Sequence, residues 1–218
     1  MLAVGAHPDD IELGCGGALL AHKRRGDRLG LLVMTTGEQG PQASRSRVQE
    51  QEDAAAILGA ELLWGGFEDG AVPEGRAAID AIQEAARALD AETVYTHTPQ
   101  DTHQDHRATA VATLGACRRL SRILMYEAPT SVGFSPSLFV DIRALVEPKI
   151  DLLRAHVSQV LKNGLVDLEA VEAQARYRGF QARVRQAEAF ETDRFLLDLA
   201  AADAAGMGRV IALDEVLA

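Results

Sequence analysis

The sequence is poor in aromatic residues and cysteine, and it contains no long apolar run. Aromatic residues make up 5% of the 218 residues, so Ala, Leu, Val and Gly must fill the interior, which suits close packing of helices on a sheet. No apolar run approaches the roughly 20 residues of a membrane-spanning helix, and no signal-like segment precedes the first predicted strand. The two cysteines, Cys15 and Cys117, fit reduced thiols better than a disulfide. We therefore expect a cytoplasmic protein without membrane insertion.

Basic residues are also in short supply. The chain has 22 Lys and Arg against 32 Asp and Glu, a formal net charge of −10 and a pI near 5.1. Nucleic-acid binding depends on clustered basic side chains. The charge balance therefore argues against a nucleic-acid partner.

Short apolar stretches alternate with helical patterns through the first two thirds of the chain. This alternation predicts βαβ units and a doubly wound, mostly parallel α/β sheet. We expect one domain, 1–218, with a core at 1–142 and a helical C-terminal part at 143–218. Strands are predicted near residues 3–6, 29–34, 61–64, 93–96 and 123–126, with a possible edge strand at 210–213. Helices are predicted at 14–25, 45–58, 73–89, 108–120, 143–162 and 167–178.

The first predicted strand ends at His7, Pro8, Asp9 and Asp10. Pro8 offers no backbone donor and ends the strand. Three side chains that can bind a metal are thereby left at the carboxyl end of a strand, where open α/β sheets place their ligands. The sequence predicts a site here.

A second polar cluster follows the fourth predicted strand. His97, His103 and His106 fall within ten residues of one another, and His103 and His106 can converge on one face of a first helical turn, with Asp105 placed to orient one of them. If the first and fourth strands are neighbours at the switch point of the sheet, this cluster faces the first one.

Together the two clusters predict a metal site with His7, Asp10 and His106 as ligands. Two imidazoles and one carboxylate match the three protein ligands of catalytic zinc sites, which leave a position for water. Asp9 is next to a ligand and free to point at that water, so we expect it to be the general base. Either motif alone could instead be a capped helix start.

Three other features receive structural interpretations. The glycine cluster at 14–17 lacks the order and the lysine of a phosphate-binding loop, and we read it as a tight turn that allows close approach to the site. Cys15 is expected to be a small packed residue. His22 and His156 have no partners in the sequence and are expected at the surface or an interface.

Motifs along most of the chain resemble those of the LmbE-like, or PIG-L, family of zinc-dependent N-acetylglucosamine-type deacetylases. The first and fourth-strand motifs are specific in combination, and the late ones are weak. The resemblance lies in residues 6–10, 14–17, 36–38, Arg47 with Glu50, 54–59, 69–70, 103–106, 156–159 and 187–190.

The resemblance implies a Rossmann-like fold, zinc held by His7, Asp10 and His106, and Asp9 as the base. It further implies that His103 stabilises the oxyanion and that Asp105 orients a catalytic imidazole. The family's motif often has Glu directly after the two aspartates, where this chain has Ile11, and Glu12 is left unassigned. An amino-sugar substrate and a homo-oligomer are also implied.

Arg47 lies on the first turn of a predicted helix near the pocket. It could contact substrate hydroxyls or a carboxylate, or it could simply pair with Glu50 or Asp53.

Other activities stay open at this point. Fe²⁺ or another divalent ion could replace zinc. A two-metal phosphoesterase could recruit Asp101 and Glu127. A non-catalytic module that binds a sugar or nucleotide conjugate would need a dinucleotide fingerprint, which residues 5–17 do not supply.

Overall fold

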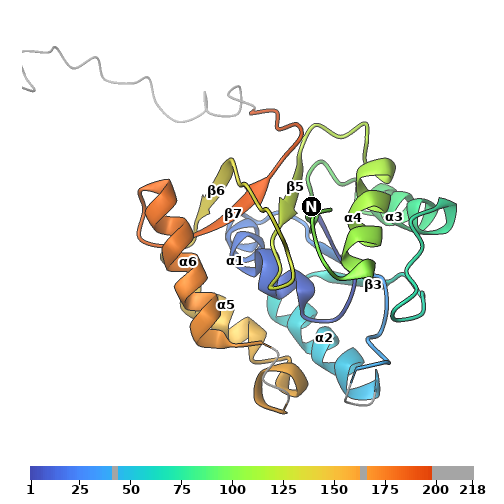
Figure 1. Ribbon diagram of the computed structural model, residues 1–218, viewed down its shortest axis with the longest axis horizontal. Coiled ribbons are helices and arrows are strands. Elements are labelled where there is room, and N and C mark those ends of the chain that lie inside the picture. Colours follow the sequence, from blue (N-terminus) through green and yellow to red (C-terminus); the bar gives the residue numbers. More distant parts are fainter. Residues whose placement is uncertain (41–43, 163–165, 198–218) are drawn as a thin grey trace, which may run out of the picture.

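The computed structural model describes residues 1–40, 44–162 and 166–197 of the chain. It confirms a mostly parallel α/β sheet flanked by helices, with the helices in two layers (Figure 1). The strands are β1 (Leu2–Gly5), β2 (Gly30–Val33), β3 (Glu61–Trp64), β4 (Val94–His97), β5 (Ile123–Tyr126), β6 (Leu138–Asp141) and β7 (Ala187–Glu191). The helices are α1 (Asp10–Arg25), α2 (Ser44–Leu58), α3 (Arg76–Ala88), α4 (Gln104–Ala116), α5 (Val146–Leu153), the π-helix η1 (Ser158–Lys162) and α6 (Leu168–Ala182).

The strands follow the order β3-β2-β1-β4-β5-β7-β6. Strands β1 to β5 are parallel, and β1 pairs with both β2 and β4, so the chain reverses its direction across the sheet between β1 and β4. Ligand sites of doubly wound sheets lie at this switch point, beyond the carboxyl ends of the strands. The neighbouring β1 and β4 are the two strands that carry the polar clusters.

Side chains of alternate strand residues enter two separate cores. On one face, Ala3 and Leu31 pack with α1, α2, α5 and α6; on the other, Leu2 and Leu32 pack with α3 and α4. All four of these strand residues are buried. Strands buried on both faces explain why the strand sequences are almost continuously apolar.

Two helices begin earlier than the sequence pattern predicts, at residue 10 instead of 14 and at 104 instead of 108. Asp9 and His103 occupy the N-cap positions, and the His103 ring accepts a hydrogen bond from the Asp105 N–H. Both first turns therefore lie at the carboxyl edge of the sheet, where they carry the polar side chains of the motifs.

The glycine cluster at 14–17 is not a turn beside the site, which corrects the expectation. It lies inside α1, where Gly14 packs on the Tyr126 ring so closely that an added Cβ would lie 2.1 Å from a ring carbon. An added Cβ at Gly17 would lie 2.9 Å from Ile142. These glycines allow α1 to pack closely against β5, which carries Tyr126, and against the segment after β6, which carries Ile142.

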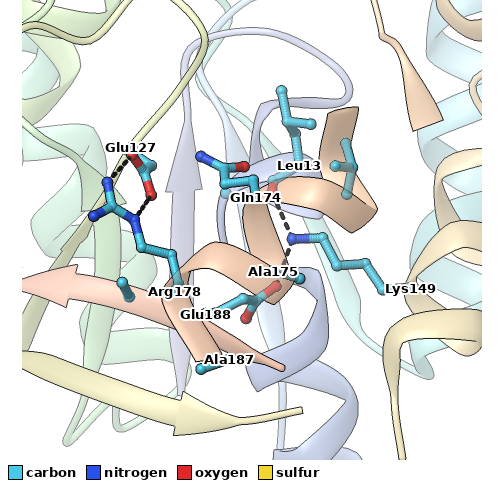
Figure 2. Close-up of a pocket in the computed structure, with 11 residues that line it drawn as sticks. Leu13, Glu127, Lys149, Gln174, Ala175, Arg178, Ala187 and Glu188 are labelled. Atoms are coloured by element: carbon cyan, nitrogen blue, oxygen red, sulfur yellow. Dashed lines mark hydrogen bonds and ion pairs between the residues drawn. The ribbon is translucent and has the colours of Figure 1, made fainter. Parts of the chain in front are cut away.

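Helix α1 is kinked at Cys15, whose φ of −141° is not helical. Figure 2 shows the ion pair that occupies the break: Lys149 donates to the Leu13 carbonyl (2.7 Å) and to Glu188 (2.6 Å). Glu188 in turn accepts from the backbone N–H groups of Gly17 and Ala18. In a regular helix the Gly17 N–H would donate to the Leu13 carbonyl, so the ion pair is inserted where that bond would form.

The C-terminal part differs from its expected pattern in two places. The helix predicted at 143–162 is divided into α5 and the short π-helix η1. Residues 187–191 form β7, a strand that lies between β5 and β6 and runs antiparallel to both. The possible edge strand at 210–213 lies outside the described residues.

Within the described part of the chain, none of the helices combines the length and apolar character needed to cross a membrane.

Candidate active site

The two polar motifs meet around the carboxylate of Asp10. One of its oxygens lies 3.3 Å from His7 Nδ1 and 3.2 Å from His97 Nε2, and the other lies 3.4 Å from His106 Nε2. The first oxygen also accepts the backbone N–H of His7 at 2.8 Å. One buried carboxylate thus joins the ends of β1 and β4, and the three residues expected as metal ligands lie side by side.

The other nitrogen of His7 faces two more carboxylates. His7 Nε2 lies 3.0 Å from Asp69 and 3.1 Å from Asp105. The Asp105 carboxylate is fixed by the backbone N–H groups of Gly70 and Val72. The structure therefore places this carboxylate on the His7 ring, whereas the sequence pattern suggested an imidazole of its own motif.

His106 is held from three sides. Its Nδ1 lies 3.2 Å from Asp101, and its ring stacks between those of His97 and His103 at centroid distances of 4.1 and 4.5 Å. Asp101 also accepts the His103 N–H at 2.8 Å. A carboxylate on the far nitrogen of a metal-binding imidazole fixes the tautomer and the ring orientation, which gives Asp101 an orienting position.

His103 is half-buried at the N-terminus of α4. Burial and the neighbouring rings of His106 and His7 lower its pKa, which favours the neutral ring. Because its Nδ1 accepts from the Asp105 N–H, the proton of the neutral ring is on Nε2. His103 can therefore donate one hydrogen bond without carrying a charge.

Asp9 has a strained backbone and a perturbed carboxyl group. Its φ of 96° lies in the left-handed region, which non-glycine residues adopt at an energetic cost. Burial and the adjacent Asp10 raise the pKa of Asp9 to about 6, although Arg47 acts in the opposite direction. A carboxyl group with a pKa near neutrality is suited to taking up and releasing a proton.

Arg47 is buried on the first half of α2. Its guanidinium donates to the backbone carbonyls of Pro8 (2.7 Å) and Gly37 (3.4 Å) and lies 3.7 Å from the Asp9 carboxylate. Its Nε has no hydrogen-bond partner in the described part of the chain.

The histidines and the carboxylates of the cluster shift each other's pKa values. Burial opposes the charge on His7, but hydrogen bonds with Asp10, Asp105 and Asp69 raise its pKa to about 12. Burial likewise opposes the charge on Asp10, but His106 and His97 bring its pKa well below the usual range. Positive charge is thus stabilised where the carboxylates converge.

The residues present fit a divalent metal ion. Among the described residues, three groups have ligand atoms that lie within 4.8 Å of one another. Imidazole and carboxylate donors match those of catalytic zinc and of related transition metals, and the buried Nδ1 of His97 lacks a hydrogen-bond partner in that part of the chain. The three groups are His7, His103 and His106; Asp10, His97 and His106; and His7, Asp69 and Asp105.

Sequence reasoning missed several residues of this region. Asp69 lies on a loop far along the chain from both motifs; the sequence predicted that the loop at 68–74 lines the pocket, and Asp69 belongs to an Asp-Gly pair that resembles the family, but it received no role of its own. Asp101 and His97 were noted but received no role in the main prediction. The expectation for His156 was wrong: it is fully buried, 3.4 Å from the Glu12 carboxylate.

The chain is similar in sequence to known proteins. The family model described as PIG-L, GlcNAc-PI de-N-acetylase, matches residues 2–117, more than half of the chain. An Escherichia coli (strain K12) protein described as the uncharacterized deacetylase YaiS is 35% identical over 167 residues, which cover 72% of this chain and 90% of that protein. The diacetylchitobiose deacetylase of Thermococcus kodakarensis is 27% identical over 185 residues, 73% of this chain and 69% of that protein.

A solved structure extends the likeness to three dimensions. The crystal structure of the conserved protein TT1542 from Thermus thermophilus superposes with a TM-score of 0.81 at 30% identity, covering 91% of this chain and 96% of that one. The family match, the identity to YaiS and the shared fold lead to one conclusion: the chain belongs to the PIG-L, or LmbE-like, family of deacetylases.

Proposed function

We propose that this protein is a zinc-dependent hydrolase that removes the acetyl group from the N-acetyl amide of an amino sugar or an amino-sugar conjugate. The observation that carries the proposal is the Asp10-centred cluster of imidazoles beside Asp9, a carboxyl group with a pKa near neutrality. The substrate class is supported by the family description and by the T. kodakarensis relative named for diacetylchitobiose.

In this proposal His7, Asp10 and His106 hold the metal, with zinc the expected ion and Fe²⁺ an alternative. The bound ion would polarise the acetamide carbonyl and lower the pKa of a water molecule. Asp101 keeps the His106 ring in the orientation that ligation needs.

Asp9 acts as the general base. It takes a proton as water adds to the amide carbon, and it returns that proton to the nitrogen as the carbon–nitrogen bond breaks, so the products are acetate and the free amine. His103 donates from Nε2 to the oxygen on which negative charge develops. Asp105 orients the His7 ring that it contacts.

Arg47 is proposed as a substrate contact. Its guanidinium lies 3.7 Å from the Asp9 carboxylate, which supports this role, because a substrate that reaches Asp9 also comes close to this guanidinium. Its bonds to the carbonyls of Pro8 and Gly37 hold the guanidinium beside the site while it binds.

The proposal also covers the domain organisation, the cellular location and the assembly of the protein. The chain forms one deacetylase domain, works in the cytoplasm on a small molecule and assembles as a homo-oligomer. Two buried cysteines without a disulfide between them support a reducing compartment. Light scattering of the purified protein will give its oligomeric state.

Metal analysis combined with an acetate-release assay tests the activity. We expect about one zinc ion per chain, as in catalytic sites with three protein ligands. Asp9→Asn should keep the zinc and lose roughly 10²- to 10⁴-fold in turnover, the contribution of a general base. His106→Ala should lose both zinc and activity.

The control for these variants is Asp80→Asn, because Asp80 is an exposed carboxylate that pairs with Arg76 away from the site. Full activity in Asp9→Asn would remove Asp9 from its role. Two metal ions per chain would favour the phosphoesterase alternative, and binding of a conjugate without turnover would favour the binding module. A panel of N-acetylated sugars and conjugates, assayed for released amine, then defines the substrate.

A further inference from the structure

The peptide group between Pro8 and Asp9 is held at both of its polar atoms by one helix. Arg47 donates to the Pro8 carbonyl at 2.7 Å, and Gln51 accepts the Asp9 N–H at 3.2 Å. Residues four apart lie on the same face of a helix, so α2 presents both side chains to this peptide. The nitrogen of this peptide group begins the N–Cα bond of Asp9, so holding the peptide in place also holds the φ of Asp9. That φ has the strained value of 96°.

Behind Gln51 lies a buried chain of polar side chains. Gln51 Nε2 donates to Glu12 at 2.7 Å, and the other Glu12 oxygen lies 3.4 Å from His156 Nε2. Gln51, Glu12 and His156 are all 0% exposed. Because the Glu12 carboxylate only accepts hydrogen bonds, it draws the NH₂ of Gln51 toward itself and leaves the Gln51 oxygen facing Asp9.

The segment that carries His156 is itself fastened to α2. Ser158 donates its N–H and its hydroxyl to the two oxygens of Glu50, the residue next to Gln51, at 2.9 and 2.6 Å. His156 is thereby placed over Glu12, although it comes from a different part of the chain. Burying three neighbouring polar side chains costs stability, and such a group is expected in a core where it holds another part of the protein in place.

We propose that Gln51, oriented by Glu12 and His156, is a positioning residue that holds Asp9 in its left-handed conformation and so aims the Asp9 carboxylate. The inference rests on the proposed function, because it takes Asp9 to be the base. It gives roles to Glu12 and His156, which the reaction itself does not use. Gln51 bonds the backbone N–H of Asp9 and the Glu12 carboxylate, so it acts through the backbone of Asp9.

The test compares three variants. Gln51→Met removes both hydrogen bonds at similar volume. Gln51→Glu keeps an acceptor for the Asp9 N–H but sets a second carboxylate against Glu12. The double exchange Glu12→Gln with Gln51→Glu restores the chain with donor and acceptor interchanged, since the amide introduced at position 12 can donate to the carboxylate introduced at position 51, which still accepts from Asp9. Gln49→Met is the matched control, because Gln49 is exposed on the same helix and bonds Asp53.

Each variant is measured in two ways: kcat, KM and zinc content with the best N-acetyl substrate, and hydrogen exchange of the Asp9 amide by ¹⁵N NMR. We expect Gln51→Met and Gln51→Glu to lower kcat by roughly tenfold to a hundredfold, the scale of a small misplacement of a catalytic group. KM and zinc content should stay within about twofold, since neither substrate nor metal contacts are removed, and the Asp9 amide should exchange faster. The double exchange should recover most of both losses.

A folded Gln51→Met with unchanged kcat and unchanged Asp9 exchange would overturn the proposal. If Gln51→Met does not fold, the double exchange decides: recovery relative to Gln51→Glu supports the proposal, and equal loss in both contradicts it. The amide exchange needs no substrate. A wild-type protein that releases no acetate while its Asp9 amide responds to Gln51 variants would therefore contradict the proposed activity and leave the positioning role intact.

Discussion

At the scale of single residues, Asp101 shows how a neighbouring carboxylate holds the histidines of the candidate site. Its carboxylate contacts His106 Nδ1, the His103 N–H and the Ser131 hydroxyl. Burial opposes the charge on Asp101, but hydrogen bonds with His106, the His103 N–H and Thr130 lower its pKa. Asp101 thus stays ionised and keeps both histidines of the second motif in place.

Replacing Asp101 by Asn should weaken metal binding. The amide can still contact His106 but cannot stabilise its ring as a carboxylate does, and loss of such a partner lowers metal affinity by roughly 10- to 100-fold. Competition with a chromophoric zinc chelator will measure this loss. Asp141→Asn is the control, since Asp141 is an exposed carboxylate that pairs with Arg143. Equal affinities for the two variants would contradict the orienting role.

His22 should make the stability of the protein fall in mild acid. It has two partners, Asp27 (2.6 Å) and Tyr95 (3.0 Å), which the sequence did not reveal, and burial lowers its pKa. A group with a lower pKa in the folded state binds its proton more readily in the unfolded state, so stability is lost as the pH falls below about 6.5. Urea unfolding at about pH 7.5 and 5.5, on either side of that value, should show a smaller loss in His22→Gln than in the wild type. An equal loss in both would exclude His22 as the source.

At this scale, site residues can be predicted from the sequence where they lie next to one another in the chain. His7, Asp9 and Asp10 directly follow one strand and Asp105 and His106 follow another, so their meeting could be expected once the strands were expected to be neighbours. Asp69 reaches the same region from the loop between β3 and α3, and Gln51 reaches it from α2. Their positions depend on how those elements pack, which no local pattern records.

At the scale of elements, the kink of α1 separates the turn that carries the site from the part that packs in the core. Residues 10–14 precede the break and hold Asp10 and Glu12, while the remainder lies along the sheet. The Lys149–Glu188 pair satisfies the backbone groups at the break (Figure 2). Buried charges that are each bonded to backbone as well as to one another avoid the penalty of an isolated ion.

Lys149→Met should destabilise the protein by about 3–5 kcal/mol, because it leaves the buried Glu188 without its partner. Urea unfolding monitored by circular dichroism will give the change. The double variant Lys149→Met with Glu188→Gln should be less destabilised than the single one, since no uncompensated charge is left. Lys23→Met, at an exposed lysine on the same helix as the kink, should change stability by no more than about 0.5 kcal/mol. A loss under about 1 kcal/mol for Lys149→Met would contradict this role of the pair.

The elements themselves were predictable to different degrees. Apolar runs in the sequence predict the strands β1 to β5. Gly26 and Gly59 predict the ends of two helices, and both glycines have a positive φ in the structure. The starts of α1 and α4 were placed four residues late, because polar site residues there also serve as first-turn and N-cap residues. The break between α5 and η1 contains no glycine that would have predicted it, and His156, which lies in this break, is fully buried.

At the scale of the whole molecule, the parallel half of the sheet was predictable and the antiparallel half was not. Alternation of strands and helices predicts parallel strands joined by right-handed crossovers. The pairing of β1 with β4, on which the meeting of the two motifs depends, was only a condition of the sequence-based prediction, and the structure confirms it. Strand β7, by contrast, has the sequence Ala-Glu-Ala-Phe-Glu, in which Glu188 is buried against the kink of α1 and Glu191 is half-buried and accepts hydrogen bonds from Thr98 and Ser135. Because its partners come from more than 45 residues earlier in the chain, local polarity gives little sign that it is a strand.

Because β7 lies between β5 and β6, the sheet can be completed only after β7 has been synthesised. Among the described strands, β6 pairs with β7 alone, so it has no neighbour in the sheet while residues 142–186 are still being made. A nascent chain of this length carries three unpaired strand edges in this half of the sheet, one on β5 and two on β6, and such edges are templates for pairing with other chains. Glu188, which arrives on the same strand, also fills the break in the helix that begins at Asp10. The last of the described strands to be synthesised thus closes the sheet and completes the support of the first helix in one step.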